Sequence, residues 1–242
     1  MNIALILSGG TGLRLGSEIP KQYLEVGGRP VICYSIETLS LHREIDAIQI
    51  VADPGWRQQI SGWLKEADPE GKFRGFSDPG ENRQLSILHG LEDIRLYARE
   101  PDRVFVHDAA RPRLSSRQIS HCLAAVEGHD GVVPVLPMKD TVYLSEDGKR
   151  VSSLLNRSQV FAGQAPEVFL LGRYLEANRR LLPEKILGIN GSTEPAILAG
   201  MDMAMIPGDE GNFKITTRND LERFRQMMDL ECAGAGGKDG EA

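Results

Sequence analysis

The sequence predicts an α/β fold with a doubly wound, mostly parallel sheet. Short apolar runs that stop abruptly at turn residues are typical of strands buried on both faces, and they occur at 3–7, 47–51, 104–106 and 132–136. Stretches with the apolar spacing of helices lie between or beside them, at 31–41, 56–64, 83–97 and 116–126. Strands and helices therefore alternate, as expected of a parallel sheet covered on both faces.

Size and charge limit the class of protein. The 242 residues suit one large α/β domain or two small ones, and 41% apolar residues can build a sizeable core. The net charge of -6 argues against a nucleic-acid partner, which normally meets a basic surface. A few local lysines and arginines can still bind phosphate. We predict a single domain at 1–230, with a β-arm at about 139–158 and a disordered tail at 231–242.

The cysteines and the apolar segments indicate in which cellular compartment the protein works. Cys33, Cys122 and Cys232 lie far apart, show no zinc-ligand spacing, and their odd number fits a reducing environment. The apolar start is too short for a signal-peptide core, and no run approaches the ~18 residues of a membrane span. We therefore predict a cytoplasmic protein with no membrane partner.

Residues 140–155 interrupt the alternation of strands and helices. Two short β-prone runs, 141–144 and 151–154, flank a turn that contains Asp147-Gly148. This pattern predicts a β-hairpin extension, with an ordinary edge hairpin on the main sheet as the alternative. Further along, 213–216 resembles a strand, and Thr217-Arg218-Asn219-Asp220 precedes an amphipathic helix at 221–230.

A glycine-rich loop follows the first strand directly, at Ser8 to Gly16. It lacks the Gly-Lys-Ser/Thr of a Walker A loop, and its last glycine comes one residue too late for GxGxxG, which disfavours hydride chemistry. Instead it reads GGxGxRxG, followed by Ile19-Pro20-Lys21-Gln22-Tyr23. Backbone donors together with the cations Arg14 and Lys21 are what a bound triphosphate needs. The five histidines form no triad pattern, and we interpret His107 as structural.

The stretch 5–30 resembles the opening of sugar-nucleotide pyrophosphorylases. More narrowly, it is similar to the 2-C-methyl-D-erythritol 4-phosphate cytidylyltransferase family and its near relative, ribitol-5-phosphate cytidylyltransferase. The resemblance covers roughly 3–228 and implies a Rossmann-like fold of the nucleotide-diphospho-sugar transferase type. Further segments in the family's order and spacing support it: Gly80-Glu81-Asn82-Arg83 with Ser86, Val106 to Pro112, Lys139-Asp140-Thr141 with Asn156-Arg157-Ser158, and Gly208 to Thr217.

The resemblance implies that CMP passes from CTP to a polyol phosphate with release of pyrophosphate. As catalytic cations it implies Arg14, Lys21 and Lys214. For nucleotide binding it implies Ser8, Gly9, Gly10, Thr11, Gly12, Gly80, Ser86 and Asp108. For the acceptor it implies Arg111, Thr141, Arg157 and Asn190. Asp108, at the carboxyl end of a strand, would also hold Mg²⁺, and the arm would pair two subunits into a homodimer.

The departures from the family pattern fall on the acceptor side. Where the family usually has Gln-Thr-Pro-Gln, this chain has Gln164-Ala165-Pro166-Glu167. In a later Thr-Asp segment Asn190 replaces the threonine, although Ser192 or Thr193 restores a hydroxyl nearby. We expect 2-C-methyl-D-erythritol 4-phosphate as acceptor, with ribitol 5-phosphate or another alcohol phosphate or phosphonate as the alternative.

A rival from another class is a non-catalytic nucleotide-binding domain that has kept the fold. Such a domain would need none of the four charged residues Arg14, Lys21, Asp108 and Lys214, and this chain has them all. The sequence therefore favours an enzyme.

Overall fold

The computed structural model describes residues 1–10 and 19–235 and has an eight-stranded sheet at its centre. The strands of this sheet are β1 (Asn2–Leu7), β4 (Ala47–Val51), β5 (Phe73–Ser77), β6 (Arg103–Asp108), β7 (Gly131–Pro137), β10 (Phe161–Gly163), β11 (Glu167–Leu170) and β12 (Met203–Pro207). The helices are α1 (Val31–Leu41), α2 (Arg57–Ala67), α3 (Arg83–Ile94), α4 (Ser116–Ala125), α5 (Leu171–Arg179), α6 (Glu194–Leu198) and α7 (Arg218–Ala235).

The sheet order explains where a ligand would bind. The strands run β10-β7-β11-β6-β1-β4-β5, with β12 paired to β7. From β1 the chain moves outward through β4 and β5, and then crosses back through α3 to β6 on the other side of β1. β1 and β6 are parallel neighbours, so their carboxyl ends lie at a topological switch point, where open α/β sheets bind ligands.

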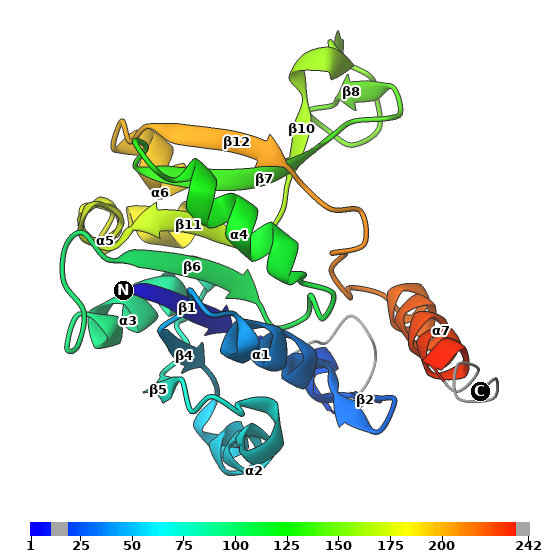
Figure 1. Ribbon diagram of the computed structural model, residues 1–242. Helices are drawn as coiled ribbons and strands as arrows, with labels where there is room; N and C mark the ends of the chain where they lie inside the picture. The colour runs from blue at the N-terminus through cyan, green and yellow to red at the C-terminus, as the bar shows by residue number, and fades with distance from the viewer. Residues whose placement is uncertain (11–18, 236–242) are drawn as a thin grey trace.

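Helices cover both faces of the sheet, as the alternation predicts (Figure 1). Alternate residues of β1 enter opposite core clusters: Ala4 and Ile6 pack with α1, α2 and α4, whereas Ile3 and Leu5 pack with α3 and α5. This double burial is the reason for the unbroken apolar run of β1. A third cluster packs the start of α7 against the small hairpin of β2 (Glu25–Val26) and β3 (Arg29–Pro30).

The sheet is mixed rather than wholly parallel. β11 runs antiparallel to both β6 and β7, and β10 runs antiparallel to β7. Pro134 does lie inside β7, but it falls between the stretch of β7 that pairs with β11 and the stretch that pairs with β10. Its missing N–H therefore leaves no ladder bond unmade on that side.

Two expectations near the carboxyl end are wrong. The segment 213–216 is no strand: it is extended, buries Ile215 beside Phe224, and makes a single backbone bond to Ala110 from the N–H of Ile215, 2.8 Å long. Side chains alternate along this segment: Phe213 and Ile215 pack in the core, whereas Lys214 and Thr216 face the cavity. None of the strands in the described part of the chain lies beside the segment to pair with it. Helix α7 is longer at both ends than the expected 221–230, since it spans Arg218–Ala235; positions 236–242 of the predicted tail lie outside the described residues.

The predicted hairpin is a separate two-stranded sheet, which makes the edge-hairpin alternative wrong. It consists of β8 (Val142–Leu144) antiparallel to β9 (Ser153–Leu155), and it is not hydrogen-bonded to the main sheet. This arm projects from the end of the sheet that carries β10 and β12 (Figure 1). Within the described parts of the chain, no helix has the length and apolar character required to cross a bilayer.

Candidate active site

A cavity of about 600 Å³ opens at the switch point. Its lining comes from the segments that follow β1, β5 and β6, together with the first turn of α3 and the extended segment before α7. The lining residues are Leu7, Gly9, Gly10, Lys21, Gln22, Gly80, Glu81, Asn82, Arg83, Ser86, Asp108, Ala110, Lys214 and Thr216. The sheet topology therefore gathers residues from both halves of the sequence around one space.

The start of the glycine loop is braced by the motif that follows it. The amide of Gln22 donates from Nε2 to the carbonyls of Ser8 and Gly10, at 2.8 Å each. The hydroxyl of Tyr23 donates to the carbonyl of Ser8 at 3.0 Å and accepts from the Ser8 hydroxyl at 2.8 Å. Ser8 is thus buried behind the cavity, and its hydroxyl is used for structure. Lys21, on the same 3-10 turn, lines the cavity instead.

Two glycines allow close contact between loops. A Cβ on Gly9 would come within 2.6 Å of the Pro79 Cβ, so the loop after β1 touches the loop after β5. A Cβ on Gly80 would come within 2.3 Å of the Leu85 Cβ and 2.9 Å of the Ser86 nitrogen. Both positions need glycine because a side chain would force the loops apart.

The hydroxyl of Ser86 also shapes the cavity wall. It accepts a hydrogen bond from the backbone N–H of Gly80 and donates one to the carbonyl of Asn82, both 2.9 Å long. Asn82 in turn caps α3 through the N–H of Leu85. Gly80 and Ser86, which the sequence predicts to bind the nucleotide, are therefore parts of one capped turn at the N-terminus of α3.

Asp108 is surrounded by three cations. Oδ1 lies 3.2 Å from Nη2 and 3.3 Å from Nε of Arg83, while Oδ2 lies 3.0 Å from Nζ of Lys214 and 3.4 Å from Nε of Arg111. Burial alone would raise the pKa of this carboxyl, but Arg83, Lys214 and Arg111 together hold it well below its ordinary value. Asp108 is consequently a fixed negative charge.

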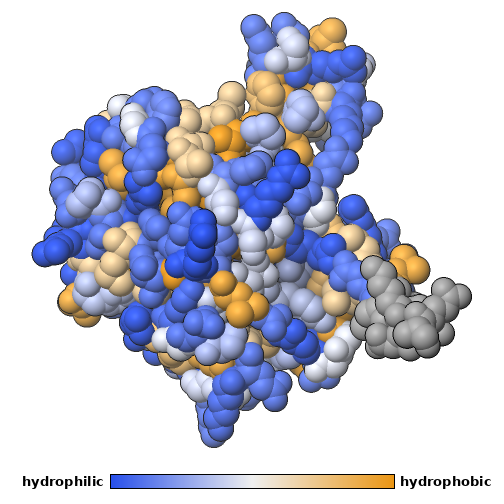
Figure 2. All heavy atoms as spheres, in the orientation of Figure 1, coloured by the Kyte–Doolittle hydropathy of each residue, from blue (hydrophilic) through white to orange (hydrophobic). Residues whose placement is uncertain are grey.

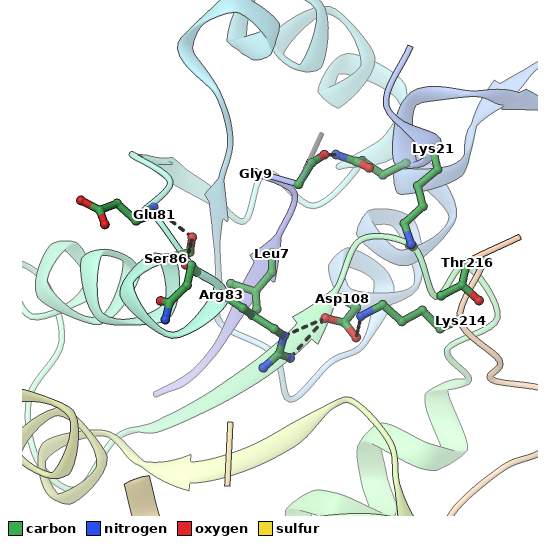
Figure 3. A pocket seen from close by; sticks show the side chains of 14 residues that line it. Leu7, Gly9, Lys21, Glu81, Arg83, Ser86, Asp108, Lys214 and Thr216 are labelled. Atoms are coloured by element: carbon green, nitrogen blue, oxygen red, sulfur yellow. Dashed lines mark hydrogen bonds and ion pairs between the residues drawn. The ribbon is translucent and has the colours of Figure 1, made fainter. Parts of the chain in front are cut away.

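Lys214 is positioned by backbone contacts on both sides. Arg111 donates from Nη1 to the carbonyl of Asn212 at 2.7 Å, and the N–H of Ile215 bonds to Ala110. Asn212 is buried and donates from Nδ2 to the carbonyl of Ala165 at 2.7 Å. Figure 3 shows Lys21 and Lys214 entering the cavity from two sides, with the amino group of Lys21 directed toward the region of Asp108.

His107 is buried next to Asp108 but takes no part in the cavity. Its Nε2 lies 3.2 Å from the carbonyl of Arg111 and 3.3 Å from the Ser35 hydroxyl. Burial lowers the pKa of His107 to about 4, although Asp108 opposes the shift. The imidazole is therefore neutral near pH 7 and supports the turn after β6, in agreement with a structural role.

The structure brings together most of the sequence-predicted nucleotide side. Lining the cavity are Gly9, Gly10, Lys21, Gly80, Ser86, Asp108 and Lys214. Ser8 lies behind it, and Arg111 contacts Asp108. Three predicted residues, Thr11, Gly12 and Arg14, lie outside the residues that the structure describes.

None of the four predicted acceptor residues lines this cavity, although Arg111 lies beside it in contact with Asp108. Thr141 and Arg157 are exposed on the arm, where Arg157 donates from Nη1 to the carbonyl of Lys139 at 2.8 Å. Asn190 is exposed in the loop before α6; its N–H bonds to Oε2 of Glu194 and its Nδ2 bonds to the carbonyl of Gly188. Within one chain, therefore, only Arg111 of the predicted acceptor residues lies next to the cavity.

Sequence reasoning missed two residues beside Asp108. Arg83 belongs to the Gly80 to Arg83 motif, but the sequence assigns it no role; it is the first residue of the capped helix α3 and lines the cavity. Glu167 departs from the family pattern, and the sequence assigns it no role either; its Oε2 lies 3.8 Å from Nη2 of Arg83. Burial raises the pKa of Glu167, and the nearby Arg83 limits the rise.

Comparison with known proteins gives the family. The family model for IspD, 2-C-methyl-D-erythritol 4-phosphate cytidylyltransferase, matches residues 2–229. The chain belongs to this family. It is 35% identical over 230 residues to the bifunctional enzyme IspD/IspF of Granulibacter bethesdensis, with 94% of this chain and 56% of that protein covered. It thus spans about half the length of the bifunctional relatives that it matches.

Other members of the family match along their whole length. The chain is 30% identical over 233 residues to ribitol-5-phosphate cytidylyltransferase of Streptococcus agalactiae serotype III, covering 95% of this chain and 96% of that protein. The crystal structure of 4-diphosphocytidyl-2C-methyl-D-erythritol synthase from Anaerococcus prevotii superposes with a TM-score of 0.80 at 25% identity, covering 95% and 96% of the two chains. The chain therefore has the fold of a family of cytidylyltransferases.

Proposed function

We propose that this protein transfers CMP from CTP to a polyol phosphate and releases pyrophosphate. The observation that carries the proposal is the cavity at the switch point, where Lys21 and Lys214 enter from two sides around the buried carboxylate of Asp108. Membership of the cytidylyltransferase family supports it.

The reaction needs positioning and charge, with no covalent nucleophile. An oxygen of the acceptor phosphate forms a bond to the α-phosphorus of CTP, while the bond from that phosphorus to the bridging oxygen breaks. Pyrophosphate departs with the electron pair of that bond. Negative charge accumulates around the five-coordinate phosphorus, where Lys21 and Lys214 would stabilise it and the backbone of Gly9 and Gly10 would hold the phosphates.

The residues present fit a magnesium ion that is bound together with the nucleotide. Among the described residues no group of three or more His, Cys, Asp or Glu could hold a metal ion by itself. Mg²⁺ commonly uses one or two carboxylates and completes its shell with phosphates and water, which suits Asp108. When bound, the ion would neutralise charge on the phosphate oxygens. Because both Asp108 oxygens already face cations, one of those contacts has to be exchanged.

The first acceptor to test is 2-C-methyl-D-erythritol 4-phosphate, the substrate in the name of the matching family, which would place the enzyme in isoprenoid precursor synthesis. The second is D-ribitol 5-phosphate, favoured by a relative of the same length that is named for it. Ala165 and Asn190 leave the choice open, because neither supplies the hydroxyl of the usual threonine. Pyrophosphate release measured with CTP and each acceptor decides between them. No release with either, or with a panel of other alcohol phosphates and phosphonates, would refute the proposal.

We expect CTP to be used in preference to UTP, ATP and GTP. The family match lies in the cytidylyl branch, and the contact of Gly9 with Pro79 narrows the cavity beside Gly80, where we expect the base to bind. Initial rates with each triphosphate at equal concentration measure the preference. Equal rates with ATP would show that the cavity does not select a pyrimidine and would contradict this assignment.

Replacing Asp108 with asparagine should lower turnover and raise the magnesium requirement. The amide keeps the size of the side chain but removes the charge that Arg83, Arg111 and Lys214 share. We expect a loss of ~10²-fold or more in turnover, typical of a lost charge at a preorganised site. The melting temperature measures folding in parallel. Full activity of the wild-type protein in excess chelator would rule out the magnesium role.

The arm suggests a homodimer. Its two strands have little core of their own, and isolated hairpins are only marginally stable in water. Yet several of its large apolar side chains are exposed, namely Tyr143, Leu144, Val151 and Leu154. Figure 2 shows apolar residues among the polar ones on this projection. We propose that the arm of a second copy covers them in a two-fold dimer, which would bring Thr141 and Arg157 to the partner's acceptor site.

A further inference from the structure

The register of the sheet places a second carboxylate on the same face as Asp108. β11 pairs antiparallel with β6, and Glu167 lies opposite Val106. Asp108 is two residues beyond Val106 on β6, so both carboxylates belong to the face that α3 covers. Arg83, the first residue of α3, reaches both of them: its Nη2 is 3.2 Å from Oδ1 of Asp108 and 3.8 Å from Oε2 of Glu167.

Glu167 is held so that one oxygen is left for Arg83. Its Oε1 accepts from the hydroxyl of Ser192 at 2.5 Å, and Ser192 is itself fixed by Tyr174, whose hydroxyl donates to the Ser192 carbonyl at 2.7 Å. Its Oε2 is buried and has no hydrogen-bond partner among the described residues. The hydrogen bond between Ser192 and Glu167 therefore joins the two segments that depart from the family pattern. Glu167 replaces an amide, and Ser192 belongs to the loop in which Asn190 replaces a threonine.

We propose that Glu167 is a positioning residue that gives Arg83 a second carboxylate, so that Asp108 can exchange its contact with Arg83 for the magnesium ion. The inference rests on the proposed function. A divalent ion near Arg83 would repel it, and a neighbouring negative charge offsets that repulsion. An amide at position 167 would offer a hydrogen-bond acceptor but no charge. The carboxylate in this chain therefore lowers the magnesium concentration at which the site assembles.

The test is Glu167→Gln, which keeps the shape and removes the charge. We expect half-saturation by Mg²⁺ to rise about tenfold, equivalent to ~1.4 kcal/mol, with the turnover number at saturating Mg²⁺ changed by less than about threefold. A second measurement needs no catalysis: the rise in melting temperature caused by CTP, without acceptor, is titrated with Mg²⁺. The variant should need about ten times more Mg²⁺ for the same stabilisation.

Two further variants separate charge from structure. Glu167→Asp keeps the charge and should lie closer to the wild type than Glu167→Gln in both titrations. Glu92→Gln breaks another arginine–carboxylate pair, with Arg179 outside the cavity, and should leave both titrations unchanged. An unaltered magnesium requirement in folded Glu167→Gln, or equal defects in the Gln and Asp variants, would overturn the inference. If the wild type itself transfers no CMP, the proposed function fails, and this inference fails with it.

Discussion

Replacing Lys214 with alanine should lower the turnover number by ~10²-fold or more, because a preorganised cation facing the transition state would be lost. The same loss is expected for Lys21→Ala. The fold should survive in both. Asp108 keeps Arg83 and Arg111 as partners when Lys214 is removed, and the turn that carries Lys21 is held by Gln22 and Tyr23. Steady-state rates of pyrophosphate release, with melting temperatures alongside, provide the measurement.

Lys65→Ala on the exposed side of α2 is the matched control, since it removes the same charge away from the cavity. It should have wild-type rates. A folded Lys21 or Lys214 variant with near-normal turnover would show that the lysine concerned does not act on the transferring phosphorus. An equal loss in Lys65→Ala would point to net charge rather than to the site.

Mixing Arg157→Ala subunits with Lys21→Ala subunits should restore activity from two nearly inactive parents. If Arg157 acts in the partner's site, the mixed dimer has one site lacking both groups and one lacking neither. Equal amounts at full exchange make half of the dimers mixed, which predicts about a quarter of wild-type activity. The guanidinium would bind the acceptor phosphate with two parallel hydrogen bonds. The measurement is the rate of pyrophosphate release as subunits exchange.

Exchange itself is followed independently, for instance by energy transfer between labelled subunits. If exchange is complete and activity stays at the parental level, Arg157 serves its own subunit or has no catalytic role. A mass from light scattering that corresponds to one chain, at the assay concentration, would exclude the shared site. Arg157 is exposed on the arm and does not line the cavity of its own chain, which is why we propose that it acts in the partner's site.

Sequence patterns predicted β1, β4, β6 and β7 and the helices α1 to α4, but neither α5 nor β12. The limits of α1 and β4 match the expected ranges, because each begins and ends where the apolar pattern does. β11 is not predictable from a local pattern, because it is only four residues long, starts with a charged residue and runs antiparallel. The segment 213–216 is predicted as a strand but is not one, because an alternating pattern of side chains does not supply a neighbouring strand to pair with.

The candidate site was predictable in its residue types but less so in its contacts. Asp108 and Lys214 could be chosen from motifs, and they lie 3.0 Å apart. The sharing of Arg83 between Asp108 and Glu167 joins three segments that are separated in the sequence, and even the bond from Gln22 back to Ser8 spans a loop. Side-chain hydrogen bonds between distant elements follow from packing, and packing is not visible in a local pattern.

The central place of β1 has a consequence for the newly made chain on the ribosome. β1 is synthesised about a hundred residues before β6, one of its two neighbours in the sheet. At typical rates of synthesis β1 waits on the order of 5–20 s for that neighbour. Until then an apolar strand with one open edge is exposed to other chains and to chaperones. Folding yield in the cell should therefore depend on how β1 is protected until β6 has been made, even though the finished strand is entirely enclosed.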